Sequence, residues 1–346
     1  MIRVFFSNYS NFLQFIKGTI ILAMLFVCSC DQVHKYQRRF FALDTIIDAI
    51  ICSRKDPSPL FDSLEILISK TDSSLSISNP ESEIWKINHR KSPTVHLSPS
   101  TVSIIRFCKT ECDSSGNLFD ITVAPLKYLY GLESHQTEEH VPSQRELDSV
   151  EQFIGCNHLN VLDDSTIMID SGVTVDLGGI AKGYLFNKIK SFFEKSGEKQ
   201  YMVNLGGDLI AWGRKPDGSK WNVGIEHPRI QGSIIGSIAV SNTCVFTSGD
   251  NERFFIKGGT RYHHLFNPKT GMPSRKNRSS TVIYDNPVLA DIFVKVAFLK
   301  DAPDAIDYLK SRNMVGVIVD STGAVWASAQ LKGTLKPDSG IKVIYR

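Results

Sequence analysis

The chain has 346 residues, of which 42% are hydrophobic and 22% are charged, and this composition is typical of a folded globular protein. Its 39 basic residues nearly balance its 36 acidic residues, and no segment is densely basic, so we expect no nucleic-acid partner. The length is sufficient for one large hydrophobic core or two smaller ones.

The N-terminal segment carries an apolar run that begins after Lys17 and ends in VCSC at residues 27–30. About a dozen apolar residues are too few to cross a bilayer but suit the core of a secretory signal. The small residues before Cys30 match a bacterial lipobox, so we expect residues 1–29 to be a lipoprotein signal peptide and Cys30 to carry the lipid. An ordinary signal peptide, or simply an apolar N-terminus, is the alternative. The lipobox predicts a protein anchored in a bacterial cell membrane on the extracytoplasmic (periplasmic) side.

The cysteines that follow this segment form an odd and scattered set. Such a set does not predict a disulfide framework. Two of them, Cys108 and Cys112, lie one turn apart in a predicted helix, so we expect both thiols to face the core and not to bind a metal as a pair. The set consists of Cys52, Cys108, Cys112, Cys156 and Cys244.

Hydrophobic periodicity and end signals predict the main elements. Successive strand patterns between residues 201 and 284 have little helix between them, which favours antiparallel pairing. We therefore expect residues 30–346 to form a single α+β domain with mainly antiparallel or mixed sheets and flanking helices. Helices are predicted near residues 58–70, 99–114, 144–154, 180–196, 287–299 and 302–312. Strands are predicted within residues 201–207, 221–226, 233–240, 253–259, 261–266, 280–285, 315–320 and 324–329.

The segment VDLGGIAKGY, residues 175–184, places three glycines and a lysine at the start of a predicted helix. It is not a Walker loop, because Gly183 and not Ser or Thr follows Lys182, and it is not a GxGxxG motif after a strand. Glycines nevertheless allow backbone N–H groups to approach an anion at a helix N-terminus, and Lys182 adds a positive charge. A tight turn without a ligand is the alternative.

Other segments combine glycine turns with acids, hydroxyl groups or histidines. Thr247, Ser248 and Gly249 read as a loop rich in small hydrogen-bond donors, and the segment after it holds two histidines followed by a Pro/Gly turn. Each has a plain structural explanation, such as a capped turn or a histidine satisfied in the core. Their occurrence together in this order is the specific signal. They are SSGNLFDITVAPL (114–126), VNLGGDL (203–209), FTSGDNERFF (246–255), RYHHLFNPKTGMP (261–273) and LADIFVKVAFL (289–299).

Between Leu43 and Phe298 the sequence resembles the ApbE-type FAD:protein FMN transferases. The resemblance implies an enzyme that splits FAD, attaches FMN through a phosphoester to a Thr or Ser of a partner protein, and releases AMP. It also implies magnesium as a cofactor and, as partner, an acceptor flavoprotein subunit of a redox complex. The segments that carry it are SEIWKIN (82–88), LFDITVAPL (118–126), VDLGGIAKGY (175–184), VNLGGD (203–208), TSGDNER (247–253), HHLFNPKTGMP (263–273) and AD (290–291).

Position by position, the resemblance implies roles for individual residues. His264 would take the proton from the acceptor hydroxyl, with orientation of a loop as its alternative role. The carbonyl of Gly179 and the side chain of Asp291 would stand where the family holds magnesium, which makes Asp291 a catalytic position as well. We expect His263 to be an exposed strand residue. The implied cofactor-binding residues are Leu43, Phe119, Asp120, Asp176, Lys182, Thr247 and Leu265.

Three residues depart from the family pattern. Asp44 replaces a glycine, and a carboxylate there would repel the diphosphate if it pointed inward. Ser78 replaces an aromatic residue and so removes a stacking surface for a planar ring. Lys295 stands four residues after Asp291, where the family has a hydroxyl ligand of the metal, and a protonated lysine cannot ligate magnesium.

The departure at Lys295 predicts an ammonium group in the metal position, paired with Asp291, unless the helix is shifted and Lys295 points to solvent. The first arrangement predicts FAD binding that depends little on magnesium, with slow or absent transfer. Three functions therefore stay open. They are an FMN transferase that modifies exported or membrane flavoproteins, a lipoprotein that holds FAD without transfer, and a diphosphatase that releases FMN and AMP.

Overall fold

The computed structural model describes residues 32–133 and 138–346, so the predicted signal peptide and Cys30 lie outside the described residues. The helices are α2 (Ser58–Leu75), α3 (Glu83–Asn88), α4 (Pro99–Ser114), α5 (Ala124–Leu129), α6 (Gln144–Glu151), α7 (Ala181–Ser196), α8 (Pro287–Phe298) and α9 (Ala302–Lys310), with short 3-10 turns η2 (Cys156–His158) and η3 (Ala329–Leu331). The strands are β1 (His34–Ala42), β2 (Thr45–Ser53), β3 (Thr94–His96), β4 (Leu159–Val161), β5 (Thr166–Ile169), β6 (Tyr201–Leu205), β7 (Asp208–Trp212), β8 (Trp221–Glu226), β9 (Ile234–Val240), β10 (Thr243–Gly249), β11 (Phe254–Lys257), β12 (Thr260–His263), β13 (Phe266–Asn267), β14 (Met272–Pro273), β15 (Asn277–Tyr284), β16 (Val315–Asp320), β17 (Val325–Ala327), β18 (Leu335–Pro337) and β19 (Val343–Tyr345).

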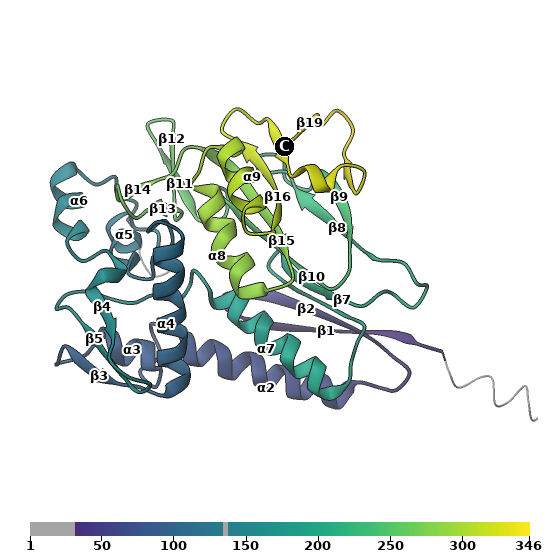
Figure 1. The fold of residues 1–346 in the computed structure, drawn as a ribbon, viewed down its shortest axis with the longest axis horizontal. Coiled ribbons are helices and arrows are strands. Elements are labelled where there is room, and N and C mark those ends of the chain that lie inside the picture. Colours follow the sequence, from purple (N-terminus) through teal and green to yellow (C-terminus); the bar gives the residue numbers. More distant parts are fainter. Residues whose placement is uncertain (1–31, 134–137) are drawn as a thin grey trace, which may run out of the picture.

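A nine-stranded sheet in the order β1-β2-β6-β7-β10-β15-β16-β17-β19 organises the molecule. Every neighbouring pair in it is antiparallel except β17 with β19, so the predicted antiparallel pairing and the α+β class are confirmed. Helices α2, α7 and α8 run along one face of this sheet (Figure 1). The small sheet of β8, β9 and β18 covers the other face through a separate apolar cluster.

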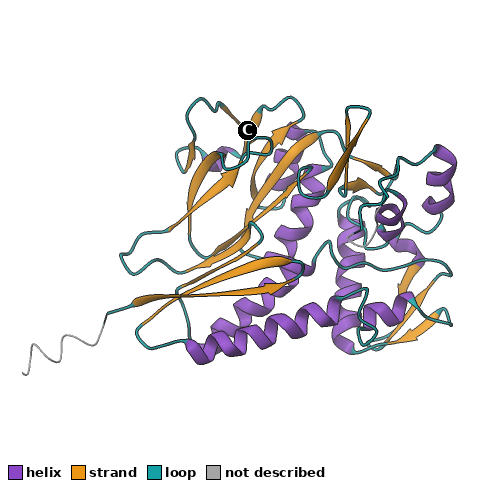
Figure 2. Ribbon diagram, turned by 180° about the vertical axis from the view of Figure 1, so that it is seen from behind, coloured by secondary structure: helices purple, strands orange, loops and turns teal. Residues whose placement is uncertain are grey.

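Helices α3 to α6 and the three-stranded sheet β3-β5-β4 gather at one end of the molecule (Figures 1 and 2). The main hydrophobic core extends continuously into this end, from Ile47 and Val203 on the large sheet to Ile105 on α4 and Ile167 on β5. Apolar burial of this kind is the dominant favourable term in folding, so the shared core fixes this end relative to the sheet.

The hairpin β1–β2 was not among the predicted strands. Its two-residue turn consists of Leu43 and Asp44, with φ angles of 51° and 56°, and Ala42 pairs with Thr45 across it. Both residues of this turn need positive φ, which glycine adopts most readily. Leu43 and Asp44 are not residues that predict such a turn, so the hairpin could not be recognised from the sequence. Asp44 therefore takes over a backbone conformation that asparagine, aspartate and glycine tolerate best.

The six predicted helices are all present, with ends that differ by a few residues, whereas the short helices α3 and α5 were not predicted. The prediction that residues 247–249 form a loop is wrong. They belong to β10, which pairs with β7 on one side and with β15 on the other. Residues 247–249 themselves pair only with β15, because the pairing with β7 ends at Val245. On that other side the N–H of Thr247 donates to Oδ1 of Asp208, so this end of the strand forms although its small polar side chains lack a strand pattern.

The cysteines of the described residues are all buried and none forms a disulfide, as the sequence predicted. Cys108 and Cys112 face the core from α4. Within the described ranges 32–133 and 138–346, no helix is long and apolar enough to cross a membrane.

Gly183 lies where α7 and α8 touch. A Cβ atom added there would sit 2.5 Å from the carbonyl oxygen of Pro287 and 2.7 Å from Cβ of Asp291. The backbone N–H of Gly183 donates to Oδ2 of Asp291 at 2.8 Å. The glycine therefore allows the close approach of two helices, a role that the anion-loop interpretation of this segment did not anticipate.

We predict that Gly183→Ala lowers the free energy of unfolding by about 1–3 kcal/mol, because the added methyl group must separate α7 from α8. Urea denaturation measures this change. Asn187→Ala, at an exposed position on the same helix, is the control and should leave stability unchanged or slightly higher. Equal stability of the two variants would contradict the proposed packing constraint.

Candidate active site

A cleft of about 1110 Å³ opens between the large sheet, the N-terminus of α7 and the α5 end of the molecule. Small-molecule sites typically occupy about 300–1,000 Å³, so this cleft can hold a large ligand. The residues that the resemblance implies for catalysis, the cofactor and the metal line it, as do the three departures from the family pattern, although these residues come from segments more than 200 positions apart. They are Leu43, Asp44, Ser78, Phe119, Asp120, Asp176, Gly179, Lys182, Thr247, His264, Leu265, Asp291 and Lys295.

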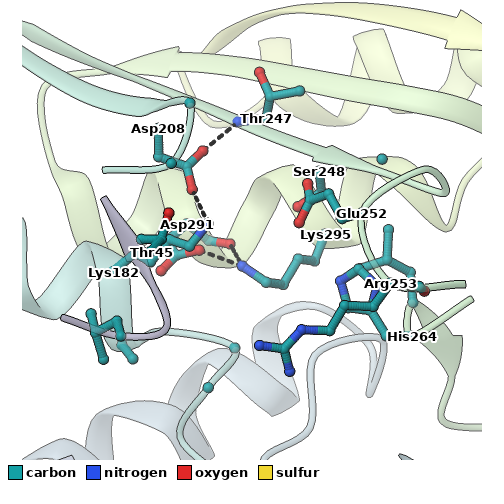
Figure 3. Close-up of a pocket in the computed structure, with 18 of the residues that line it drawn as sticks. Thr45, Lys182, Asp208, Thr247, Ser248, Glu252, Arg253, His264, Asp291 and Lys295 are labelled. Carbon is teal, nitrogen blue, oxygen red and sulfur yellow. Dashed lines mark hydrogen bonds and ion pairs between the residues drawn. The ribbon is translucent and has the colours of Figure 1, made fainter. Parts of the chain in front are cut away.

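Lys182, in the first turn of α7, is held by Asp208. Its Nζ lies 2.8 Å from Oδ2 of Asp208, whose Oδ1 accepts a hydrogen bond from the backbone N–H of Thr247 at 2.8 Å (Figure 3). Desolvation opposes the charge on Lys182, but the carboxylates of Asp208 and Glu252 outweigh it and raise the pKa of Lys182. Lys182 is therefore a fixed cation at a helix N-terminus, a combination that suits an anion.

The β6–β7 hairpin places Asp208 in the cleft. Gly206 and Gly207 form its two-residue turn with φ angles of 59° and 100°, and Leu205 pairs with Asp208 across it. Desolvation, together with the carboxylate of Asp291, raises the pKa of Asp208 even though Lys182 is its partner. From the sequence, Asp208 was noted after the glycine pair of VNLGGD (203–208), but no role was predicted for it.

Asp291 and Lys295 lie one turn apart on α8 and form an ion pair that points into the cleft (Figure 3). Nζ of Lys295 contacts Oδ1 of Asp291 and also lies 2.8 Å from the Asp291 carbonyl oxygen. Only 23% of the Lys295 side chain is exposed. The predicted pairing is confirmed, and the alternative in which Lys295 points to solvent is wrong.

The residues that the resemblance implies for a magnesium site do not fit that ion. Both carboxylate oxygens of Asp291 already have partners, Lys295 for Oδ1 and the Gly183 N–H for Oδ2. The side chain at position 295 offers three donors and no lone pair. Magnesium requires near-octahedral oxygen ligands, and the positions that the resemblance implies for the ion offer only the carbonyl of Gly179 and a carboxylate that is already paired with an ammonium.

Phe119 and Asp120 enter the cleft after α4. The Phe119 ring packs so close to Gly179 that a Cβ there would lie 3.3 Å from it. Oδ1 of Asp120 accepts hydrogen bonds from the backbone N–H and the hydroxyl of Thr122, at 2.8 and 2.6 Å, and from Sγ of Cys156 at 3.3 Å. This oxygen therefore holds its own loop in place, and the cofactor-binding role of Asp120 stays a prediction.

Asp176 is paired with Lys127, which projects from α5. Although desolvation opposes the effect, the Lys127 ammonium lowers the pKa of Asp176, and the N–H of Gly178 donates to it at 2.7 Å. The sequence gave no signal for Lys127. Helix α5 has only six residues, so its periodicity could not show which way a lysine would point.

His263 is buried, which corrects the expectation of an exposed strand residue. Its Nε2 donates to the carbonyl of Ser274 at 2.7 Å, and its Nδ1 accepts from the N–H of Leu265 at 3.2 Å. Both ring nitrogens are thus satisfied within the protein. His263 positions the chain that carries His264 and Leu265 into the cleft.

His264 lines the cleft beside Arg253 (Figure 3). Its Nδ1 lies 3.4 Å from the carbonyl oxygen of Arg253, so Nδ1 carries the hydrogen and Nε2 keeps a free lone pair. Desolvation, together with the nearby Lys127 ammonium, lowers the pKa of His264 to about 3. The ring is therefore neutral near pH 7, and its Nε2 has no hydrogen-bond partner among the described residues.

The two other departures from the family pattern also lie at the cleft. Asp44 is largely exposed, and its Oδ2 lies 3.7 Å from Nη2 of Arg253, so its charge is partly offset. Ser78 is exposed, and both its hydroxyl and its backbone N–H lie 3.2 Å from the hydroxyl oxygen of Ser76 on the same loop. The predicted loss of a stacking surface for the flavin stays a prediction.

The sequence model of the ApbE family matches residues 43–319, which are 277 of the 346 residues, and the chain therefore belongs to the ApbE family. It is 27% identical over 232 residues to the FAD:protein FMN transferase of Vibrio cholerae, covering 66% of this chain and 70% of that protein. The Escherichia coli K12 protein of the same name is 24% identical over 348 residues, covering 93% and 98%. The crystal structure of the ApbE protein of Thermotoga maritima superposes with a TM-score of 0.81 at 28% identity, covering 87% of this chain and 99% of that one.

The lowered pKa of His264 predicts a dependence of stability on pH. The unfolded chain binds a proton on this ring below about pH 6.5, whereas the folded protein does so only near pH 3. The stability that neutral His264 contributes is therefore present above about pH 6.5 and is lost as the pH falls.

Urea unfolding between pH 7 and pH 4 should show the wild type losing stability relative to His264→Gln. His34→Gln, an exposed position outside the cleft, should follow the wild type, and parallel curves for all three proteins would contradict the assignment.

Proposed function

We propose that this protein transfers FMN from FAD to a threonine or serine hydroxyl of another protein and releases AMP. The observation that carries the proposal is the neutral His264, with a free Nε2, in the same large cleft as two lysines that are fixed by carboxylates. Relatives over most of the chain are named FAD:protein FMN transferases, which supports the same reaction.

The residues suggest how the reaction proceeds. The acceptor oxygen attacks the FMN-side phosphorus, a new P–O bond forms, and the bond from that phosphorus to the bridging oxygen breaks, so that AMP leaves with the bridging oxygen. Nε2 of His264 takes the hydroxyl proton. Lys182 and Lys295 face the diphosphate and stabilise the charge that develops on its oxygens. Phe119 and Leu265, both buried at the cleft, offer apolar surface to the flavin.

Two other outcomes of the same site are open to test. If water replaces the acceptor hydroxyl, the chemistry becomes FAD hydrolysis to FMN and AMP. If the phosphorus is too weakly polarised, the protein binds FAD and does not turn it over. Positioning contributes much of the rate in phosphoryl transfer, so a partner that presents its hydroxyl correctly favours transfer over hydrolysis.

We further propose that the protein acts on an exported or membrane-bound flavoprotein subunit of a redox complex, from a lipid anchor at Cys30. The support is the short apolar run and the small residues before Cys30 in the sequence. Lipidation with several acyl chains holds a protein on a membrane, whereas one chain gives only marginal binding.

Incubation of the purified protein with FAD and a folded acceptor domain that bears an exposed threonine tests the transfer. Mass spectrometry should show the acceptor gaining the mass of one FMN. His264→Ala should slow this gain by about 10²–10⁴-fold, because it removes the base, while FAD binding changes little. His34→Ala is the control and should transfer at the wild-type rate. Free FMN with an unmodified acceptor, or intact bound FAD alone, would contradict transfer and support hydrolysis or binding instead.

Expression of Cys30→Ala in a bacterial host tests the anchor. The variant should leave the membrane fraction, because the remaining apolar segment is too short to span the bilayer. Wild-type protein should stay in membranes washed with high salt. A Cys30→Ala protein that also stays there would show that an uncleaved N-terminal segment, and not a lipid, holds the protein.

A further inference from the structure

We propose that the ammonium group of Lys295 replaces the divalent cation in this cleft, so that FAD binds through its diphosphate without a metal ion. The inference rests on the proposed function for the identity of the ligand. It concerns a separate property, the dependence of FAD binding on metal, which can be measured without any acceptor protein.

The position of Lys295 is fixed by its surroundings. It contacts the carboxylate and the carbonyl of Asp291, the residue one turn earlier on α8. Asp291 is itself fixed to α7 through the N–H of Gly183. The ammonium group therefore has a defined place in the cleft without any ligand, and side-chain entropy is not lost again when an anion binds.

The charges around this position explain what the lysine does. Three carboxylates, Asp208, Glu252 and Asp291, lie close enough to Lys182 to act on its charge, and Lys295 in turn acts on Glu252. With a threonine at position 295, the ammonium beside Asp291 would be lost, and the carboxylates around Lys182 would attract a divalent cation more strongly. With Lys295, an ammonium already fills the place beside Asp291.

Lys295 thus removes the reason for a metal in two ways. It lowers the negative charge that would attract the ion, and it takes the carboxylate oxygen that the ion would need. Two lysines, in the first turn of α7 and the last turn of α8, then present fixed positive charges to an anion that enters the cleft (Figure 3). A single charge polarises a diphosphate less than a dication does, which allows binding and slows chemistry.

The first test needs no variant. Equilibrium dialysis of the wild-type protein against FAD, with chromatography to confirm that the nucleotide stays intact, gives the dissociation constant in EDTA and in excess Mg²⁺. The proposal predicts that the two values agree within about threefold, since no ion takes part in binding. A loss of about tenfold or more on chelation would overturn it.

Two substitutions separate charge from ligation. Lys295→Met removes the charge and offers no oxygen, so FAD binding should weaken by about tenfold or more in both EDTA and Mg²⁺. Lys295→Thr also removes the charge but supplies a hydroxyl oxygen, so its FAD binding should be weak in EDTA and recover in Mg²⁺. Lys195→Thr, at an exposed position near the far end of α7, is the control and should behave as the wild type does. Recovery of Lys295→Met by Mg²⁺ would show that the metal is held by other oxygens and would also overturn the proposal.

These results are independent of the transferase assay. Metal-independent FAD binding without FMN transfer would leave the inference intact and reject the proposed function. Rapid FMN transfer that EDTA abolishes would support the proposed function and reject the inference. If Lys295→Thr unfolds, the comparison of EDTA with Mg²⁺ on the wild-type protein still decides the matter.

Discussion

The carboxylate of Asp291 is the point on which the site depends. One of its oxygens accepts the N–H of Gly183 and so joins α8 to the first turn of α7, and the other pairs with Lys295. A buried carboxylate is costly unless it is paired and hydrogen-bonded, and Asp291 has a partner of each kind. The same two contacts set the separation of the helices and the place of a positive charge in the cleft.

Other charges in the cleft are also paired, but there the acid and the base come from different parts of the chain. Asp208 on β7 holds Lys182 on α7, and Lys127 on α5 holds Asp176. The pairs join the large sheet, the helices beside it and the α5 end of the molecule around one cavity. Polar groups that are fixed before a ligand arrives need little reorganisation during a reaction, which is the main source of electrostatic stabilisation in enzymes.

The sequence predicted the parts of the fold that have strong local signals. Long amphipathic helices such as α4 and α7 show periodicity and end signals, and the strands after residue 201 alternate or are rich in β-branched residues. The hairpin β1–β2 was missed because its turn, Leu43–Asp44, uses positive φ without glycine or asparagine. The end of strand β10 was read as a loop because pairing with β15, and not its own composition, makes residues 247–249 a strand.

Individual residues of the site could be predicted only where a sequence motif or a helical spacing identifies them. The spacing of four residues placed Lys295 beside Asp291, and the structure agrees. Lys127 and the burial of His263 were not predictable, because each depends on a contact between distant segments or on a neighbouring loop. Glu252 and Arg253 belong to the segment TSGDNER (247–253), which carries part of the family resemblance. Their side chains line the cleft because the fold brings α8 and the region of β12 to this segment, and the sequence does not show that contact.

A crystal structure of the protein with FAD and Mn²⁺ tests the central claim most directly, because the anomalous signal of manganese locates any bound ion without ambiguity. The account predicts the FAD diphosphate in contact with Lys182 and Lys295, the Lys295–Asp291 pair intact, and no anomalous peak beside Asp291. A manganese ion bound to Asp291 and the carbonyl of Gly179, with Lys295 displaced from the cleft, would contradict it.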